Sequence, residues 1–338
     1  MNIVKDFSLT NYNTFHIDVK ADYFCEIHSL EDLQELLSHN IFLNNNRLIL
    51  GGGSNILFTS DFSGLVIKNS IKSIEEIHED EHFVFVKAGA GVIWDELVNY
   101  CVNKNYGGIE NLTYIPGTVG AAPIQNIGAY GAELKDVFYS LEGVVLKENK
   151  LKEFYKKDCY FGYRSSIFKN EYKNKIFISS VTLKLNKIPK INIEYSALKE
   201  SAKNYKTEEL TVAKISEIVK EIRKSKLPDP SEFGNAGSFF KNPEVDKETK
   251  ERLENEFEDI ISFNTDKDIY KIPAGWLIEK CGLKGFRLGN TGTYKKQALV
   301  IINFNNASGK EIYEFSNFIK DKVYNKFQIE LETEVNVV

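Results

Sequence analysis

The sequence has few cysteines and no long apolar run. Its four cysteines, at positions 25, 101, 159 and 281, are widely spaced and form no C-x-x-C pair, which suits reduced thiols better than a disulfide framework. No stretch approaches the ~18 consecutive apolar residues of a membrane span, and the N-terminus lacks a basic region followed by an apolar one. We therefore expect a cytoplasmic protein without a membrane segment.

Large blocks of one charge are also lacking. The 338 residues contain 43 Lys and Arg against 48 Asp and Glu, a formal net charge of −5 at pH 7, and the two signs are mixed along the chain. Duplex nucleic-acid binders cluster their cations, so this class is disfavoured, whereas a phosphate-bearing small molecule needs only a few local donors. Cys25 and His28 are too few to hold a metal, so none is expected. The sequence does not determine the oligomeric state, and a monomer is our expectation.

The composition is that of a globular protein with a large core, with 42% apolar and 12% aromatic residues. At roughly 150 residues per domain, the length predicts two or three domains. A strand at residues 47–50 runs into glycines. A second strand at 83–87 passes through Gly89-Ala-Gly91 into a helix with one apolar face at Trp94, Leu97, Val98 and Cys101.

Capping patterns mark two helix starts. Ser29 with Asp32, and Ser308 with Glu311, each precede residues of helical apolar spacing. A third helix, with apolar residues from Val212 to Ile222, must end before Leu227-Pro228, and the lysine-rich segment before it suggests a domain boundary. Residues 327–337 alternate as a final strand, with Glu330, Glu332 and Glu334 on one face that we expect to meet water or a cation.

Two glycine-rich loops are candidate binding sites. Gly51-Gly-Gly-Ser-Asn55 follows a strand and turns backbone N–H groups toward one point, where a phosphate could bind. It does not fit the G-x-G-x-x-G spacing of a Rossmann site, and a tight turn without a ligand is the alternative. The longer loop, residues 115–131, contains four glycines. We favour a ligand there, because an irregular loop of this length without a function is uncommon.

Two further segments carry reactive side chains. Arg164, in Phe-Gly-Tyr-Arg-Ser-Ser at 161–166, could hold a carboxylate in a bidentate grip, although alone it is more often a surface arginine. Ser238 lies between small residues and an aromatic pair in the 235–243 segment. This is not a G-x-S-x-G elbow and no histidine is placed as its base, so hydrolase chemistry is disfavoured and a turn serine is the usual alternative.

The motifs occur in a recognisable order: GGGSN, IPGTVGAAPIQNIGAYG, FGYRSSIF, KLPDP, GNAGSFFKNP, AGWLIE, KKQALVIIN and LETEV. Together they resemble the UDP-N-acetylenolpyruvoylglucosamine reductase family over roughly residues 13–335, in the subtype with an extra tyrosine loop. The resemblance implies an α+β fold, with an FAD-binding domain of the vanillyl-alcohol-oxidase type and a second α/β substrate-binding domain. The implied divisions are a flavin domain of two subdomains at 17–187, a connecting segment with the tyrosine loop at 188–210, a substrate domain at 211–325, and a C-terminal strand at 326–338.

The resemblance also implies non-covalent FAD, with NADPH as reductant. Residues of both loops would bind the FAD: Gly51, Gly52, Gly53, Ser54, Asn55, Pro116, Gly117, Gly120, Ala121, Asn126, Gly128, Ala129, Tyr130 and Gly131. Ser238 matches the family's proton donor, and Arg164 and Glu334 match the residues that stabilise the enolate-like intermediate. Substrate-binding positions correspond to Tyr195, Lys226, Asn242 and Gln297.

Two departures from the family pattern bear on the site. Asn336 stands where many members have arginine, which removes a cation near Glu334, and Ala121 with Ala122 replaces hydroxyl residues of some relatives. A flavin oxidase acting on another small molecule would need a different substrate domain. A non-catalytic flavin-binding protein would not need Arg164, Ser238 and Glu334 together. Both alternatives are therefore less favoured than the reductase.

Overall fold

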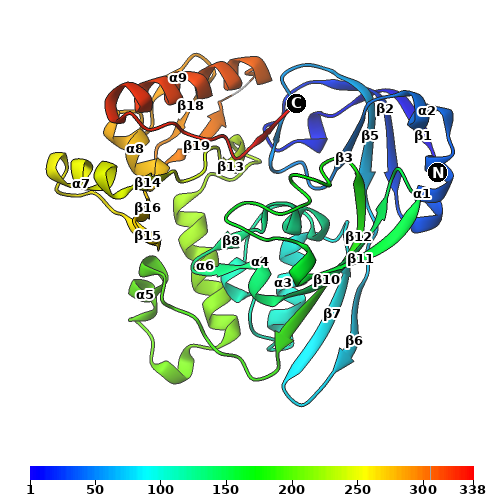
Figure 1. The fold of residues 1–338 in the computed structure, drawn as a ribbon, viewed down its shortest axis with the longest axis horizontal. Coiled ribbons are helices and arrows are strands. Elements are labelled where there is room, and N and C mark those ends of the chain that lie inside the picture. Colours follow the sequence, from blue (N-terminus) through cyan, green and yellow to red (C-terminus); the bar gives the residue numbers. More distant parts are fainter. Residues whose placement is uncertain (305) are drawn as a thin grey trace. The chain divides into compact units, whose positions relative to one another are not determined.

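The computed structural model describes residues 1–304 and 306–338, which form a mixture of helices and strands (Figure 1). These residues divide into two compact units, each built from several chain segments. The first comprises Met1–Phe7, Lys20–Gly53 and Phe62–Ser225. The second comprises Ser8–Val19, Ser54–Asp61 and Lys226–Val338. The N-terminal part of the chain thus contributes to both units.

The first unit begins with a four-stranded sheet. Its strand order is β1 (Ile3–Ser8), β2 (Lys20–Ile27), β5 (Phe62–Asn69) and β3 (Arg47–Leu50), with β2 and β3 parallel to β5. Two helices, α1 (Leu30–Leu37) and α2 (Asn40–Asn44), connect β2 to β3. The Ser29 hydroxyl accepts a hydrogen bond from the Asp32 amide at 3.1 Å, which confirms the predicted start of α1.

A five-stranded antiparallel sheet forms the larger part of this unit. Its order is β11 (Lys150–Tyr155), β10 (Phe138–Val145), β12 (Ile176–Asn186), β7 (Phe83–Gly89) and β6 (Ile74–Glu79). Helix α3 (Trp94–Asn103) buries Trp94, Leu97, Val98 and Cys101 in the same core as Val84 and Val86 of β7. The predicted strand, glycine turn and helix are confirmed.

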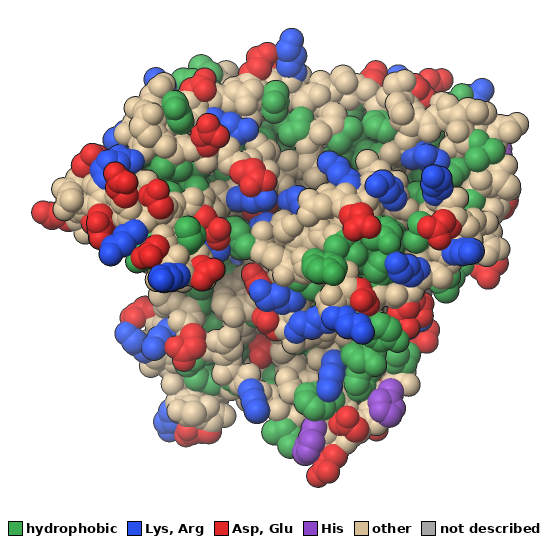
Figure 2. Space-filling view, in the orientation of Figure 1, with side chains coloured by type: hydrophobic (Ala, Val, Ile, Leu, Met, Phe, Trp, Pro, Cys, Tyr) green, Lys and Arg blue, Asp and Glu red, His purple; other side chains and the backbone are tan. Residues whose placement is uncertain are grey.

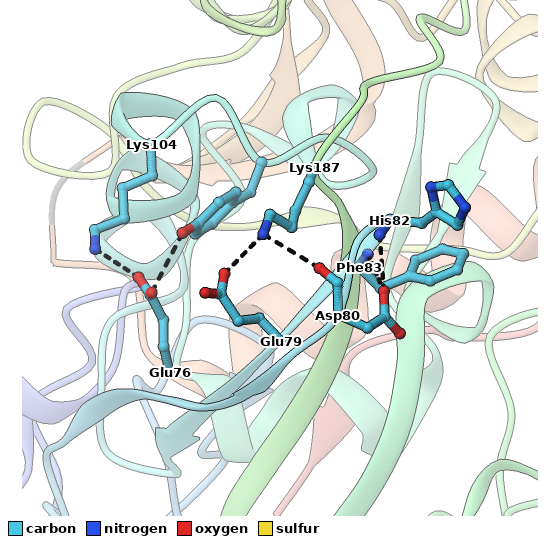
Figure 3. Close-up of polar contacts among 8 residues, drawn as sticks. Glu76, Glu79, Asp80, His82, Phe83, Lys104 and Lys187 are labelled. Carbon is cyan, nitrogen blue, oxygen red and sulfur yellow. Dashed lines mark hydrogen bonds and ion pairs between the residues drawn. The ribbon is translucent and has the colours of Figure 1, made fainter.

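Charged side chains fasten the edge strand β6 (Figure 3). Glu76 accepts hydrogen bonds from Lys104 at 2.5 Å and Tyr100 at 2.8 Å, both on or next to α3. Lys187 donates to Glu79 at 2.8 Å, and the Asp80 carboxylate accepts from the amide of Phe83 at 2.7 Å in the turn between β6 and β7. These contacts connect the edge strand β6 and the turn after it to α3, Lys187 and β7.

Helices α5 (Ser196–Ala202) and α6 (Val212–Lys226) complete the first unit. Helix α6 ends before Leu227-Pro228, as predicted. Its buried residues Ile215, Ile218, Val219 and Ile222 form a separate apolar cluster with Leu198 of α5. All of α6 except Lys226 groups with the first unit, and Tyr130, Ile191 and Leu210 of that unit pack against the same cluster.

The second unit contains two antiparallel sheets. One has the order β13 (Gly234–Ser238), β19 (Gln297–Asn303), β18 (Thr291–Tyr294) and β17 (Arg287–Leu288), and helices α8 (Ala274–Lys280) and α9 (Gly309–Phe327) pack against it. The other has the order β14 (Glu244–Asp246), β16 (Ile269–Lys271) and β15 (Phe263–Asp266), next to α7 (Lys247–Glu256). Ser308 and Glu311 form the predicted capping box of α9.

The predicted final strand is wrong over most of its length. Helix α9 continues to Phe327, and the only regular strand beyond it is β20 (Asn336–Val337) among the described residues, parallel to β4 (Ile56–Leu57). The alternation of buried and exposed side chains holds up to residue 332 and then fails, because Glu334 and Val335 are both buried. The chain changes partner here, from residues 239–241 to β4, and this interrupts the pleat. The three carboxylates therefore do not share one water-facing side.

Charges of both signs are interspersed over the face drawn in Figure 2. The Glu332 carboxylate forms an ion pair with Lys241. None of the described helices combines the length and the apolar character needed to cross a bilayer.

The start of α9 allows a test of packing against helix propensity. A methyl group on Gly309 would overlap the backbone carbonyl oxygen of Phe58. Propensity favours alanine over glycine by up to about 1 kcal/mol, but we expect Gly309→Ala to lower the free energy of unfolding by about 1–3 kcal/mol, because the overlapping atom is backbone. Denaturant unfolding measures the change. Lys310→Ala, at the next and exposed position, should stay within about 0.5 kcal/mol; a stabilised Gly309→Ala variant would contradict the packing argument.

Candidate active site

Two glycine loops of the first unit run against each other. A methyl group on Gly52 would lie 2.8 Å from the Cα atom of Gly117, so neither loop can carry a side chain at this crossing. Gly53 and Gly117 have φ values of 65° and 115°, which glycine adopts readily. The predicted cofactor residues Gly51, Gly52, Gly117 and Ala121 thus come together, and part of the glycine requirement arises from loop-to-loop packing.

Thr118 lies at the centre of this crossing. A methyl group on Gly51 would lie 2.7 Å from the Thr118 Oγ1 atom and 3.4 Å from the Cβ atom of Ala121. Thr118 Oγ1 is buried and has no hydrogen-bond partner among residues 1–304 and 306–338. Since buried hydroxyl groups are usually paired, this atom indicates a binding position for a ligand acceptor.

The middle of the 115–131 loop is held by the segment that carries Arg164. Arg164 Nη2 donates to the Gly128 carbonyl at 2.9 Å, and Asn126 Nδ2 donates to the Gly162 carbonyl at 3.1 Å. Ser166 Oγ donates to the Ile124 carbonyl at 2.7 Å. Asn126 is fully buried and left-handed, with φ 44°. The structure therefore brings three predicted site residues, Asn126, Gly128 and Arg164, into one hydrogen-bonded network.

The end of this loop contacts the tyrosine segment. The rings of Tyr130 and Tyr195 lie 5.2 Å apart, edge to face. The buried Asn111 side chain donates through Nδ2 both to the Tyr130 carbonyl, at 2.8 Å, and to the Asn192 carbonyl, at 2.9 Å. Gly131 is also linked, because Asn192 Nδ2 donates to its carbonyl at 3.2 Å. The predicted cofactor and substrate residues therefore adjoin at this point.

A second arginine, Arg223 on α6, lies next to the same loop. Its Nε atom donates to the Tyr114 carbonyl at 3.0 Å. Burial raises the pKa of the Tyr130 hydroxyl, and the positive charge of Arg223 opposes this rise. Burial lowers the pKa of the Arg223 guanidinium, nearby Tyr130 and Asp95 oppose the shift, and the like charge of Arg164 adds to it. Two cationic groups thus lie near residues 128–130.

In the second unit, the predicted proton donor and the predicted glutamate lie on adjoining segments. Ser238 ends β13, after a left-handed Gly237 with φ 69°. The Glu334 amide donates to the Phe239 carbonyl at 2.9 Å, and Phe240 pairs with Thr333 as an antiparallel bridge. Ser238 is half-buried, while Glu334 is buried. The pairing of these segments fixes the backbone at both positions.

Asn55 and Asn336 support Glu334. Asn55 Nδ2 donates to the Glu334 carbonyl at 3.4 Å. The Asn55 carbonyl accepts both the amide of Asn336, at 3.1 Å, and its side-chain Nδ2, at 3.0 Å. Asn336, the departure from the family pattern, therefore anchors the backbone beside Glu334.

The remaining predicted residues have varied surroundings. Lys226 is exposed at the end of α6. Asn242 Oδ1 accepts the Ala274 amide at 2.9 Å, and Gln297 Oε1 accepts the Leu299 amide at 3.3 Å. Ser54 follows the crossing loop and belongs to the second unit. Pro116 is exposed, Gly120 packs against Ala90, and Ala129 pairs with Ala132. The functions of these residues stay predictions.

Sequence reasoning missed Thr118, Asn111 and Arg223. Thr118 carried a usable signal, because it is the hydroxyl residue between Gly117 and Gly120. Asn111 and Arg223 carried none, because their partners lie far away in the sequence, 81 residues for Asn192 and 109 for Tyr114.

Comparisons with known proteins show the family to which the chain belongs. Residues 229–338 match the model of the UDP-N-acetylenolpyruvoylglucosamine reductase C-terminal domain, and residues 21–152 match an FAD binding domain. The chain is 46% identical to the UDP-N-acetylenolpyruvoylglucosamine reductase of Flavobacterium johnsoniae and 44% identical to that of Amoebophilus asiaticus, over 100% of both chains in each case. The resemblance inferred from the motifs is confirmed.

A solved structure shows the same fold. The reductase from Thermus caldophilus aligns with a TM-score of 0.67 over 99% of this chain and 98% of its own, at 21% identity. Together with the two matched domains, this confirms the predicted α+β class with a flavin domain and a second domain.

A buried carboxylate just before the 115–131 loop predicts a pH effect. Glu110 is 2% exposed and accepts the Gly108 amide at 2.6 Å. Burial raises its pKa, although backbone N–H groups oppose this. The folded state thus binds the proton more tightly than the unfolded state, so the contribution of this group to stability falls as pH rises through its folded pKa.

We therefore expect Glu110→Gln to show a smaller loss of stability than wild type as the pH rises above 4.5, the ordinary pKa of this carboxyl group. Urea unfolding at several pH values measures this, with the exposed Glu208→Gln as control. Identical pH profiles for wild type and Glu110→Gln would contradict the assignment.

Proposed function

Because the chain belongs to the UDP-N-acetylenolpyruvoylglucosamine reductase family, we propose that it is an FAD-dependent enzyme that uses NADPH to reduce UDP-N-acetylglucosamine enolpyruvate to UDP-N-acetylmuramate. The observation that carries this proposal is the 46% identity to the Flavobacterium johnsoniae reductase along the whole of both chains. The three predicted catalytic residues, Arg164, Ser238 and Glu334, are all present in their motifs.

The residues of the two crossing loops fit FAD. The crossing of Gly52 and Gly117 leaves backbone without side chains, and the unpaired buried hydroxyl of Thr118 can donate to a phosphate or ring oxygen. The loop residues named from the family pattern, from Gly51 to Asn55 and from Pro116 to Gly131, would hold the cofactor. When bound, FAD supplies the hydride for the reaction.

The substrate gains a hydride at its vinyl CH2 carbon and a proton at the adjacent carbon, so its C=C bond becomes a single bond. Negative charge develops on that adjacent carbon and its carboxylate. The Arg164 guanidinium pairs with the carboxylate, and its hydrogen bond to Gly128 fixes its direction. Glu334 stabilises the same charge in its protonated form, because an ionised carboxylate would repel it.

Ser238 delivers the proton to the adjacent carbon. A serine hydroxyl is a weak acid in water, but a carbanion-like carbon is a strong base and the donor is held in place. Two features support this role: the left-handed turn at Gly237 and the pairing of Phe239 with Glu334. Lys226 and Tyr195 bind the diphosphate of the substrate, and Asn242 and Gln297 bind other parts of it.

We also propose the domain division expected from the family pattern: flavin binding at 17–187, a connecting tyrosine segment at 188–210, substrate binding at 211–325, and a C-terminal segment with Glu334. The matches at 21–152 and 229–338 support the two main parts. A cytoplasmic location is supported by the four free cysteines, which suit a reducing compartment.

An anaerobic visible spectrum tests the activity. We expect the purified protein with FAD to bleach on addition of NADPH and to regain its absorbance on addition of the enolpyruvyl sugar nucleotide. Flavin that stays reduced after the second addition would rule out this substrate and favour another flavin reaction. A protein that binds no FAD would overturn the proposal.

The assigned role of Ser238 has a separate test. Ser238→Ala should leave bleaching by NADPH nearly unchanged and slow reoxidation by the substrate about 10²–10⁴-fold, the usual contribution of a positioned proton donor. Stopped-flow absorbance separates the two steps. Ser231→Ala, in the same unit and exposed, should change neither. If both steps slow equally in Ser238→Ala, the residue is not the proton donor.

A further inference from the structure

We infer that Arg223 is a positioning residue that clamps both ends of the 115–131 loop and so sets the affinity for FAD. This inference rests on the proposed function, because it takes that loop as part of the cofactor site. No motif pointed to Arg223, which lies on α6, outside both glycine loops.

The residues at the two ends of the loop have a backbone conformation that is energetically unfavourable for any residue with a Cβ atom. Tyr114, just before the loop, has φ 60°, and Tyr130, its penultimate residue, has φ 49°. Residues with a Cβ atom rarely adopt the left-handed region, and they keep it only where the surroundings impose it. The conformation of the loop ends therefore depends on contacts from outside the loop.

Helix α6 supplies these contacts at the first end. Arg223 Nε donates to the Tyr114 carbonyl at 3.0 Å, and the buried Ser216 and Thr113 hydroxyl oxygens lie 2.8 Å apart. Ser216 and Arg223 are seven residues apart, which places them on one face of the helix. The Asp95 carboxylate accepts the Tyr114 amide at 2.6 Å, so the peptide groups on both sides of this residue are bonded.

The same helix contacts the second end. The Tyr130 side chain packs against the apolar cluster of Ile215, Ile218, Val219 and Ile222. Arg223 directly follows Ile222 of this cluster, and its positive charge opposes the rise that burial causes in the pKa of the Tyr130 hydroxyl. One side chain therefore interacts with both loop ends, which are 16 residues apart in the sequence.

Only arginine has the donor geometry for this role. A guanidinium offers five N–H donors in a rigid fork and keeps its charge when partly buried, whereas a lysine ammonium is a flexible point donor. A lysine at position 223 would keep the charge near Tyr130 but would not reproduce the fixed bond to Tyr114. This difference separates a positioning role from a purely electrostatic one.

The experiment measures FAD dissociation constants by fluorescence titration, together with Tm, on the full chain. We expect Arg223→Met to weaken FAD binding at least 10-fold and Arg223→Lys to give an intermediate value. The matched control is Arg252→Met, since Arg252 Nη2 donates to the Phe327 carbonyl at 2.6 Å in the second unit. This control should lower Tm without changing FAD affinity.

A double-mutant cycle is a second test of whether Arg223 and Tyr130 act together on FAD affinity. The double variant, with Arg223→Met and Tyr130→Phe, should weaken FAD binding by less than the product of the two single fold-changes. The reason is that both substitutions act on the same loop end. If Arg223→Met binds FAD as tightly as wild type, or if its effect multiplies independently with Tyr130→Phe, the inference is overturned. Should Arg223→Met fail to fold, an Arg223→Lys affinity equal to wild type overturns it. If wild type itself binds no FAD, the proposed function fails first.

Discussion

The close approach of two backbone loops is the constraint on which the first unit's site depends. Gly52 and Gly117 meet at a distance that excludes a Cβ atom, and this contact fixes where Thr118 and the rest of the 115–131 loop can lie. Further along the loop, Arg164 donates to the Gly128 carbonyl, and the Asn111 side chain donates to the Tyr130 carbonyl. Because the loop has few large side chains of its own, its conformation depends on hydrogen bonds from residues outside it.

Local features of this fold could be predicted from the sequence. Ser29 and Ser308 mark helix starts because a cap involves residues three positions apart, and the strand before Gly89 follows from its short-range pattern. The family motifs predicted the flavin domain and the second domain. These predictions succeeded because each depends on residues that are close in the sequence or on a motif already known from relatives.

The failures have a common physical cause. The alternation of apolar residues in 327–337 predicts a strand, but it cannot reveal that this segment exchanges one pairing partner for another near Glu334. Arg223 looks like any cation on an amphipathic helix until its distant partner Tyr114 is known. Long-range pairing of backbone groups decides both cases, and no local pattern encodes it.

The second unit is assembled from three separate stretches of chain, and this bears on how it forms. Thr14 Oγ1 donates to the Asn235 carbonyl, Asn303 Nδ2 donates to the Phe15 carbonyl, and β20 adds to β4. These contacts close chain loops of 221 to 288 residues. Loops of this size slow folding, because their entropy is lost before the contacts form. Ser238 and Glu334 lie in the unit that these contacts close, so we expect their surroundings to form late in folding.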